Sequence, residues 1–257
     1  MKEDVSIFLG DCRDIMKSIA TGSVDMILCD LPYGTTQCKW DAIIPFDALW
    51  SEYKRVIKHK GAIVLFGAEP FSSMLRTSNL PMFKYDIIWD KIKGTGFLNA
   101  KRQPMRNHEV ISVFYSGQCT YNPQKTNGHN KKTTFRSKSL QTDVYGDMNK
   151  DYYYSSTERY PRSIQAFSTD TQNSSLHPTQ KPVALCEYLI KTYTNAGEIV
   201  LDNCMGSGTV GVACKATGRK FIGIEKDATF YDIATKRINA PFVCKKQIER
   251  MPSTLFS

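Results

Sequence analysis

Short apolar runs bounded by polar residues recur along the chain, and they alternate with longer stretches in which apolar residues recur at helical spacing. The short runs predict strands, and the longer stretches predict helices. Strands are expected at Ser6–Leu9, Val24–Cys29, Ala62–Phe66, Tyr85–Trp89, Val110–Tyr115, Ile199–Leu201 and Phe221–Ile224. Helices are expected over residues 12–20, 46–58, 70–78, 183–195, 208–217 and 228–239.

Alternation of strands and helices indicates an α/β fold, in which the helices cover both faces of a parallel sheet. The pattern therefore predicts a seven-stranded, mostly parallel, doubly wound sheet. A short crossing over residues 90–109 joins the strands at 85–89 and 110–115, so these two are expected to form a terminal hairpin. With 257 residues, the chain can form one such domain with an insertion.

Residues 198–225 follow the order strand, glycine loop, helix, strand, acid. Gly206, Gly208 and Gly211 fit the G-x-G-x-x-G spacing, and Glu225 lies close to the interval at which an acid binds ribose hydroxyls. The loop predicts a nucleoside-containing cofactor, and a dinucleotide is a serious rival. A dinucleotide-binding domain needs several more strands after this unit, whereas few residues follow Glu225. The rest of the sheet must therefore come from earlier residues.

The tetrad Asp30-Leu31-Pro32-Tyr33 ends the apolar run at 24–29. Asp30 and the carbonyl group of Leu31 are suited to accept the two hydrogens of an exocyclic amino group on a nucleic-acid base. Pro32 restricts the geometry of the residue before it and so aims that carbonyl, while Tyr33 offers a face for stacking. Alone, the tetrad also describes a strand that ends in a proline turn. Its combination with the glycine loop favours methylation of a base amino group.

Taken together, these features resemble an S-adenosylmethionine-dependent amino-methyltransferase of DNA. The motif order resembles the β group, in which the catalytic half precedes the cofactor half. The resemblance covers about residues 4–240, with two departures from the family pattern: Leu31 replaces the usual Pro or Ala, and Asn203-Cys204 replaces the usual Pro-Phe. Further matches are Gly10-Asp11-Cys12, Trp89-Asp90-Lys91, Arg106-Asn107-His108-Glu109, Tyr160-Pro161-Arg162-Ser163 and His177-Pro178-Thr179-Gln180-Lys181-Pro182.

The resemblance implies a Rossmann-like methyltransferase domain in permuted order. Residues 1–115 form its catalytic half, 116–175 a target-recognition insertion, 176–240 its cofactor-binding half and 241–257 a C-terminal tail. The implied cofactor is S-adenosyl-L-methionine and the implied catalytic residues are Asp30, Leu31, Pro32 and Tyr33. The implied cofactor-binding residues are Asp11, Cys12, Asp30, Thr179, Lys181, Asp202, Cys204, Gly206, Ser207, Gly208, Thr209 and Glu225.

Two of these cofactor residues carry specific expectations. By resemblance, the carboxylate of Asp11 accepts a hydrogen bond from the adenine amino group of the cofactor, although an ordinary helix N-cap has the same sequence. Thr179 and Lys181 are expected beside the methionine part of the cofactor, with Lys181 reaching its carboxylate.

Charge and composition favour duplex DNA as the partner. The net charge is +9, and the segment from Lys91 to His108 contains five Lys or Arg and no acid, as a clamp on phosphates or a solvated loop does. Residues 116–175 are rich in polar and aromatic side chains, which fits either a recognition insertion or a loosely folded loop. The expected DNA contacts are Lys91, Lys93, Lys101, Arg102, Arg106, Lys131, Lys132, Arg136, Tyr160 and Arg162.

The expected reaction is direct methyl transfer to N6 of an adenine that has left the duplex. Adenine is preferred to cytosine N4 because enzymes resembling the latter usually carry Ser at the position of Asp30. Methylation of RNA or of a protein glutamine is the main competitor, but in those classes the glycine loop ordinarily comes first. A nicotinamide-dependent oxidoreductase leaves the tetrad unexplained. A DNA-binding protein without catalysis is disfavoured because the tetrad and the glycines are all present.

Cysteine usage and hydropathy give further expectations. The eight cysteines form no C-x-x-C pair and no spacing suited to zinc, so reduced thiols and no metal site are expected. There is also no Pro-Cys pair, as methylation at cytosine C5 requires, and no zinc-deaminase signature. Without an apolar run of about 20 residues or a signal peptide, a cytoplasmic protein that does not enter membranes is expected. Proteins of the resembling group are often dimers, so a homodimer is expected from the resemblance alone.

Overall fold

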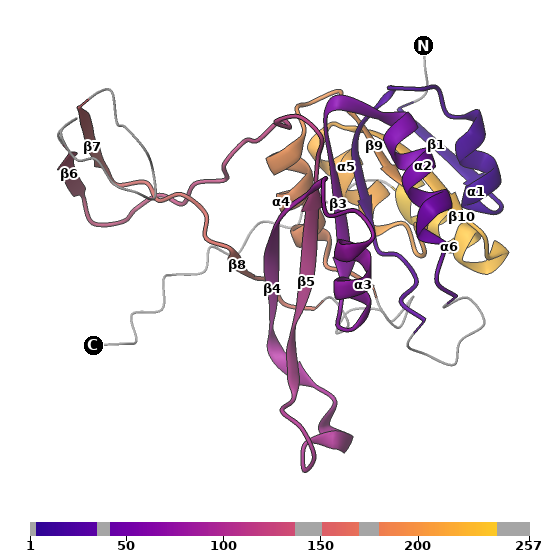
Figure 1. Cartoon of the computed structure of the whole chain (residues 1–257), viewed down its shortest axis with the longest axis horizontal. Coiled ribbons are helices and arrows are strands. Elements are labelled where there is room, and N and C mark those ends of the chain that lie inside the picture. The colour runs from indigo at the N-terminus through magenta and orange to yellow at the C-terminus, as the bar shows by residue number, and fades with distance from the viewer. Residues whose placement is uncertain (1–3, 35–41, 137–150, 170–179, 241–257) are drawn as a thin grey trace.

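A computed structural model describes residues 4–34, 42–136, 151–169 and 180–240. Its centre is an eight-stranded sheet in the order β1-β10-β9-β2-β3-β5-β4-β8 (Figure 1). The strands of this sheet are β1 (Val5–Leu9), β2 (Val24–Cys29), β3 (Ile57–Gly67), β4 (Phe83–Thr95), β5 (Arg106–Phe114), β8 (Ile164–Ala166), β9 (Ile199–Asp202) and β10 (Lys220–Glu225). The α-helices are α1 (Cys12–Ile15), α2 (Phe46–Val56), α3 (Phe71–Thr77), α4 (Val183–Tyr193), α5 (Thr209–Thr217) and α6 (Ala228–Asn239).

Alternate residues of the central strands enter two separate cores, one on each face of the sheet. Met26 and Leu28 of β2 pack with residues of α4, α5 and α6. Ile27 and Cys29 of the same strand pack with residues of α1, α2 and α3. Because successive side chains of a strand point to opposite faces, a strand buried on both sides is apolar throughout. This burial explains the four consecutive apolar residues Met26 to Cys29 that precede Asp30.

The mostly parallel α/β sheet and its hairpin are confirmed, with one correction to the strand count. β5 runs antiparallel to its neighbours β3 and β4, whereas the β1–β10, β10–β9, β9–β2, β2–β3 and β4–β8 pairs are parallel. The predicted count of seven is wrong because β8 adds an eighth strand beside β4. Its three residues, Ile164-Gln165-Ala166, are too few to show a periodic pattern.

The pairing of β2 with β9 joins the two halves of the chain. Met26 lies opposite Val200, and Ile27 lies opposite Leu201, in parallel register. The carboxyl ends of the two strands therefore meet at one edge of the sheet, which is where open α/β sheets bind ligands. Asp30 follows one of these strands, and Asp202 ends the other.

Two projections leave this body (Figure 1). The β4–β5 hairpin extends beyond the sheet, and a short 3-10 helix, η2 (Phe97–Asn99), lies at its end. Strands β6 (Lys132–Arg136) and β7 (Tyr152–Ser156) form a separate two-stranded antiparallel sheet. Both lie within segments that the sequence assigns to DNA contacts.

The predicted 116–175 insertion is thus only partly outside the body. Cys119 belongs to the core under α4, and the side-chain amide of Asn122 donates hydrogen bonds to the carbonyl groups of Lys191 and Thr194. Residues 137–150 and 170–175 of this segment, and the predicted tail at 241–257, lie outside the described residues. Of the described helices, none has the length and apolar character needed to cross a membrane.

Candidate active site

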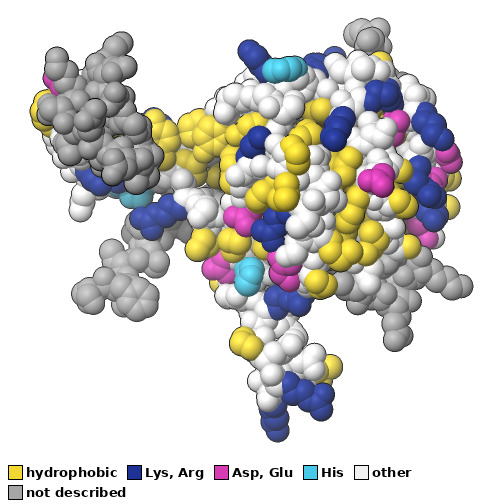
Figure 2. All heavy atoms as spheres, viewed as in Figure 1, with side chains coloured by type: hydrophobic (Ala, Val, Ile, Leu, Met, Phe, Trp, Pro, Cys, Tyr) yellow, Lys and Arg dark blue, Asp and Glu magenta, His cyan; other side chains and the backbone are white. Residues whose placement is uncertain are grey.

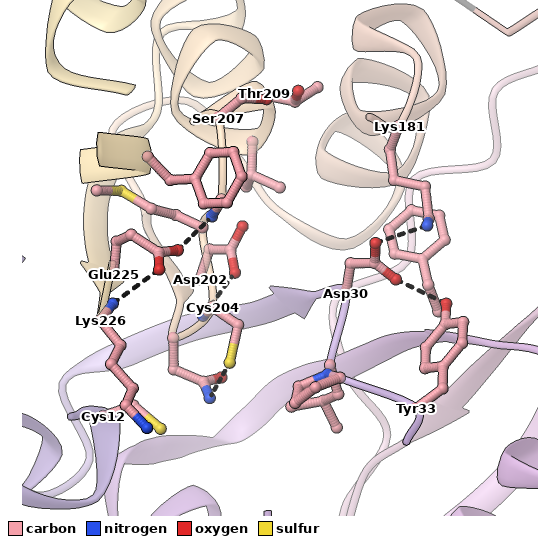
Figure 3. Close-up of a pocket in the computed structure, with 18 of the residues that line it drawn as sticks. Cys12, Asp30, Tyr33, Lys181, Asp202, Cys204, Ser207, Thr209, Glu225 and Lys226 are labelled. Atoms are coloured by element: carbon pink, nitrogen blue, oxygen red, sulfur yellow. Dashed lines mark hydrogen bonds and ion pairs between the residues drawn. The ribbon is translucent and has the colours of Figure 1, made fainter. Parts of the chain in front are cut away.

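A pocket of about 960 Å³ opens at the carboxyl ends of β2, β9 and β10. The tetrad and the glycine loop both line it, and Figure 3 shows their side chains facing one space. The residues named from the sequence that line this pocket are Asp11, Cys12, Asp30, Leu31, Pro32, Tyr33, Lys91, Lys181, Asp202, Cys204, Gly206, Ser207, Thr209 and Glu225. Thr179 lies outside the described residues.

Glu225 is fixed at the end of β10 by backbone donors. Its Oε2 atom accepts a hydrogen bond of 2.8 Å from the amide of Gly206, and its Oε1 atom accepts bonds of 2.8 Å from the amides of Lys226 and Asp227. Carboxylate oxygens have lone pairs beyond these three bonds, and ribose hydroxyls are suitable donors for them. The geometry thus agrees with the ribose-binding role expected of this acid.

Gly208 supports the glycine loop without lining the pocket. It has φ +78°, and a Cβ atom there would come within 2.9 Å of the Cβ atom of Ala234 on α6. Arg237 of the same helix donates hydrogen bonds to the carbonyl oxygen and the hydroxyl of Ser207, at 2.5 and 2.8 Å. Sequence reasoning missed Arg237, because a basic residue in a terminal helix has no motif of its own.

Asn203 and Cys204, the residues that depart from the family pattern, have defined contacts. The Tyr53 hydroxyl donates a 2.6 Å hydrogen bond to the side-chain oxygen of Asn203. The thiol of Cys204 is hydrogen-bonded to that of Cys12, which lowers the pKa of Cys12 to about 7. An aromatic side chain is still present in the pocket, because Phe230 of α6 lines it.

Asp11 has the N-cap geometry that the sequence allows. Its Oδ1 atom accepts from the Arg13 amide at 2.9 Å, and the Arg13 guanidinium group lies 2.7 Å from Oδ2. The hydrogen bond from that guanidinium group lowers the pKa of Asp11 to about 2. Asp11 also lines the pocket, so the cap and a contact with the cofactor are compatible.

Asp202 is the most deeply buried carboxylate beside the pocket, with 3% of its surface exposed. Its Oδ1 atom accepts a hydrogen bond of 3.1 Å from the amide of Cys204. Burial raises the pKa of Asp202 to about 7, because the charged form loses its hydration. A cationic ligand beside Asp202 therefore favours its ionised form.

The side chain of Asp30 is held between two donors (Figure 3). The Tyr33 hydroxyl donates to Oδ1 at 2.6 Å, and the Lys181 ammonium group donates to Oδ2 at 2.6 Å. The sequence directs Lys181 to the carboxylate of the cofactor, whereas here its ammonium group pairs with Asp30. Lys181 lies just before α4, and its side chain reaches the pocket. Asp30 is the carboxylate closest to its ammonium group, so electrostatic attraction explains the pairing.

The other tetrad residues have distinct surroundings. Leu31 is 4% exposed and packs in the core with α1, α2 and α3, so an apolar side chain suits this position. The ring of Tyr33 stacks on Phe71, with centroids 4.9 Å apart. Phe71 therefore occupies one face of the Tyr33 ring, and the Lys181 ammonium also lies over this ring, 5.9 Å from its centroid.

Beyond Lys181, two charged residues of the β4–β5 hairpin extend this ion-pair network. The Lys181 ammonium lies 3.3 Å from Oε2 of Glu109, and the Lys91 ammonium lies 2.5 Å from Oε1 of Glu109. The sequence assigns Lys91 to DNA phosphates, but its side chain is only 12% exposed and lines the pocket. The structure thus pairs Lys91 with Glu109 beside the pocket, and its contact with a DNA phosphate stays a prediction.

The remaining residues expected to bind DNA lie on the two projections and on the connection between β7 and β8. Lys93, Lys101, Arg102 and Arg106 are exposed on the hairpin, and Figure 2 shows basic side chains gathered at its end. Lys131 and Lys132 are exposed at the start of β6, and Arg136 ends that strand. Tyr160 is 58% exposed, with the Lys125 ammonium 4.8 Å from its ring centroid, and Arg162 is exposed nearby.

Comparisons with known proteins agree with this fold and site. A family model for DNA methylases of the N6/N4 type matches residues 24–236. Type II methyltransferase M.HinfI of Haemophilus influenzae is 28% identical over 285 residues, which cover 93% of this chain and 70% of that protein. Type II methyltransferase M.HpaI of Haemophilus parainfluenzae is 28% identical over 256 residues, covering 93% of this chain and 76% of that protein.

Solved structures show the same architecture. The complex of M1.HpyAVI with S-adenosylmethionine aligns with a TM-score of 0.63 and 25% identity, covering 92% of this chain and all (100%) of that chain. The PvuII DNA methyltransferase (cytosine-N4-specific) aligns with a TM-score of 0.67 over 94% of this chain and 89% of its own, and at 13% identity it shows the fold alone.

The α/β sheet carries the glycine loop and the tetrad Asp30-Leu31-Pro32-Tyr33 at one edge, and this arrangement is that of an amino-methyltransferase that uses S-adenosylmethionine. The chain belongs to the N6/N4 DNA methylase family and has the motif order of the β group.

Proposed function

We propose that the protein transfers a methyl group from S-adenosylmethionine to N6 of adenine at a specific site in duplex DNA, and that the adenine leaves the duplex to react. The observation that carries this proposal is that Asp30 and the glycine loop face one pocket although they are far apart in sequence. Leaving the stack costs a few kcal/mol, which contacts with phosphates and with the pocket must offset.

The pocket fits the cofactor on the donor side. Glu225 offers a fixed carboxylate to the ribose hydroxyls, Asp11 offers an acceptor to the adenine amino group, and Gly206 leaves room for close approach of the ligand to the backbone. Bound S-adenosylmethionine supplies an electrophilic methyl group on a sulfonium. Asp202 is a buried carboxylate beside this cationic ligand.

On the acceptor side, Asp30 and the Leu31 carbonyl accept the two amino hydrogens of the base. The bonds hold the nitrogen lone pair toward the methyl group, and the Asp30 charge stabilises the positive charge that grows on nitrogen. Tyr33 orients Asp30 through its hydroxyl, and its ring is the group that we assign to stacking on the base. Positioning at near-attack distance supplies much of the acceleration.

Identification of the methylated base tests this proposal. The protein is incubated with labelled S-adenosylmethionine and, separately, with duplex DNA, RNA and a protein mixture, and the DNA is digested to nucleosides for mass spectrometry. Label in DNA as N6-methyladenine is the expected result. Label as N4-methylcytosine overturns the choice of base, and transfer only to RNA or protein overturns DNA as the substrate.

Affinity for S-adenosylmethionine is expected to rise with pH between about 6 and 8. The pKa of Asp202 is raised to about 7, so its carboxyl group is mostly neutral below that pH and ionised above it. A cationic ligand binds better to the ionised form, so affinity increases as the proton leaves. Titration calorimetry across this pH range measures the trend. In Asp202→Asn, affinity for S-adenosylmethionine should not rise with pH. A rise equal to that of the wild type contradicts the role assigned to Asp202.

Replacement of two exposed hairpin cations, Lys101→Gln with Arg102→Gln, is expected to weaken DNA binding similarly on all sequences. A plot of log affinity against log salt concentration has a negative slope, and each lost phosphate contact reduces the magnitude of that slope by about 1. The double substitution should therefore reduce it by about 2. Fluorescence anisotropy at several salt concentrations measures the slope. Lys54→Gln, an exposed lysine on α2, is the matched control and should leave the slope unchanged.

Dimer formation stays a prediction. Sedimentation velocity of the free protein measures it, and a single species at the mass of one chain contradicts it.

A further inference from the structure

Four charged groups, Asp30 of the tetrad and three less exposed side chains beyond it, form an ion-pair network. Lys181 has 8% of its side chain exposed and pairs with Asp30 at 2.6 Å and with Glu109 at 3.3 Å. Lys91 pairs with the other oxygen of Glu109 at 2.5 Å, and these two side chains are 12% and 13% exposed. The network alternates in sign, from Asp30 through Lys181 and Glu109 to Lys91, and its formal charges sum to zero.

Aromatic rings surround the two cations of the network. The Lys181 ammonium lies 5.3 Å from the ring centroid of Phe66 and 5.9 Å from that of Tyr33. The Lys91 ammonium lies 5.2 Å from the ring centroid of Trp89. Rings attract cations but cannot replace water as hydrogen-bond acceptors, so each ammonium depends on its carboxylates.

Glu109 lies between the two lysines and forms ion pairs with both. Its buried Oε2 atom accepts no hydrogen bond of ordinary geometry from the described residues, so the contact with Lys181 at 3.3 Å is electrostatic. Burial alone would raise the pKa of Glu109, but the Lys181 and Lys91 ammonium groups outweigh it and lower that pKa. Glu109 is therefore an anion that acts on Asp30 through Lys181.

We propose that Glu109 is a positioning residue for methyl transfer, because it holds Lys181 between two carboxylates and so fixes the orientation and charge of Asp30. Without Glu109, Lys181 has Asp30 as its one carboxylate partner among the described contacts and neutralises it more completely. Asp30 then accepts the amino hydrogens less well and gives less stabilisation to the positive charge on nitrogen. The inference rests on the proposed role of Asp30.

The site also gains a positive charge when Glu109 is lost. The network is neutral with Glu109 and carries one net positive charge without it. Both the cationic cofactor and the amine, which becomes positive during transfer, are disfavoured by that charge. The effect on the amine appears only during the reaction, so we expect a larger change in kcat than in substrate affinity.

Kinetics of Glu109→Gln test the proposal. We expect kcat to fall roughly 10- to 100-fold, while the dissociation constants for S-adenosylmethionine and DNA change by less than this. Glu109→Asp should recover part of kcat.

Two further variants keep the result interpretable. Glu109→Gln combined with Lys91→Met removes one charge of each sign and restores the neutral network, so any loss of thermal stability should be smaller than in Glu109→Gln. We expect its kcat to stay low, because Lys181 still lacks its second carboxylate. Glu187→Gln, on the outer part of α4 where Glu187 pairs with Lys191, is the matched control and should leave kcat unchanged.

The outcomes separate this inference from the proposed function. A kcat for Glu109→Gln within twofold of the wild type overturns the role of Glu109, and so does a loss of substrate affinity as large as the loss of kcat. Asp30→Asn is measured in parallel. If Asp30→Asn loses transfer and Glu109→Gln does not, only the present inference fails. If Asp30→Asn keeps full transfer, the proposed function itself fails.

Discussion

Asp30→Asn is expected to lower kcat by roughly 10²- to 10³-fold, while S-adenosylmethionine still binds. The amide has nearly the same size as the carboxylate, but it lacks the charge and replaces one acceptor oxygen with a donor. The base amino group then loses an acceptor, and the positive charge on nitrogen loses its closest anion. Single-turnover methylation of a duplex substrate measures the effect, and calorimetry measures cofactor binding.

Stability needs a separate control in this variant. Loss of the Asp30 charge leaves the Lys181 ammonium, which is 8% exposed, with Glu109 at 3.3 Å as its remaining carboxylate. We expect a loss of about 1 to 3 kcal/mol in the free energy of unfolding, at the lower end because Asp30 is 26% exposed. Asp30→Asn with Lys181→Met removes both charges and should recover stability without recovering transfer. Full transfer by either variant, with the cofactor bound, rules out the assigned role of Asp30.

The meeting of tetrad and glycine loop could be predicted from the sequence because it depends on strand direction alone. The apolar runs identify β2 and β9 as buried parallel strands, and parallel strands bring their carboxyl ends to one edge. Asp30 and Asp202 are each found at such an end. The meeting of the two strand ends depends little on side-chain identity. The prediction of this meeting therefore holds although the sheet has eight strands and not the predicted seven.

The partners of individual side chains could not be predicted in the same way. Lys181 and Asp30 are 151 positions apart, and their pairing depends on how α4 approaches β2. Glu109 and Lys91 face the pocket because the β4–β5 register places them on the inner part of the hairpin, which a count of basic residues does not reveal. The sequence thus predicts a basic hairpin, but it does not reveal that the innermost lysine, Lys91, pairs with Glu109.

Glu225→Gln is expected to weaken S-adenosylmethionine binding by roughly 10- to 100-fold, corresponding to loss of about 1.5 to 3 kcal/mol from bonds to a charged acceptor. The carboxylate accepts three backbone amides, from Gly206, Lys226 and Asp227. A glutamine has one side-chain oxygen, so its amino group must face at least one of these amide donors. The glycine loop then shifts, and the ribose loses an ionised acceptor. Titration calorimetry with S-adenosylmethionine and with S-adenosylhomocysteine measures both affinities.

Glu198→Gln is the matched control for this variant. The Glu198 carboxylate also accepts a backbone amide, that of Asn195 at 2.7 Å, but it lies just before β9, at the opposite end of the sheet from the pocket. It should alter stability without altering cofactor affinity. Equal weakening in both variants indicates a general loss of folding, whereas unchanged binding in Glu225→Gln contradicts the ribose role. Because S-adenosylhomocysteine lacks the sulfonium charge, a similar loss for both ligands places the effect at the nucleoside and separates Glu225 from Asp202.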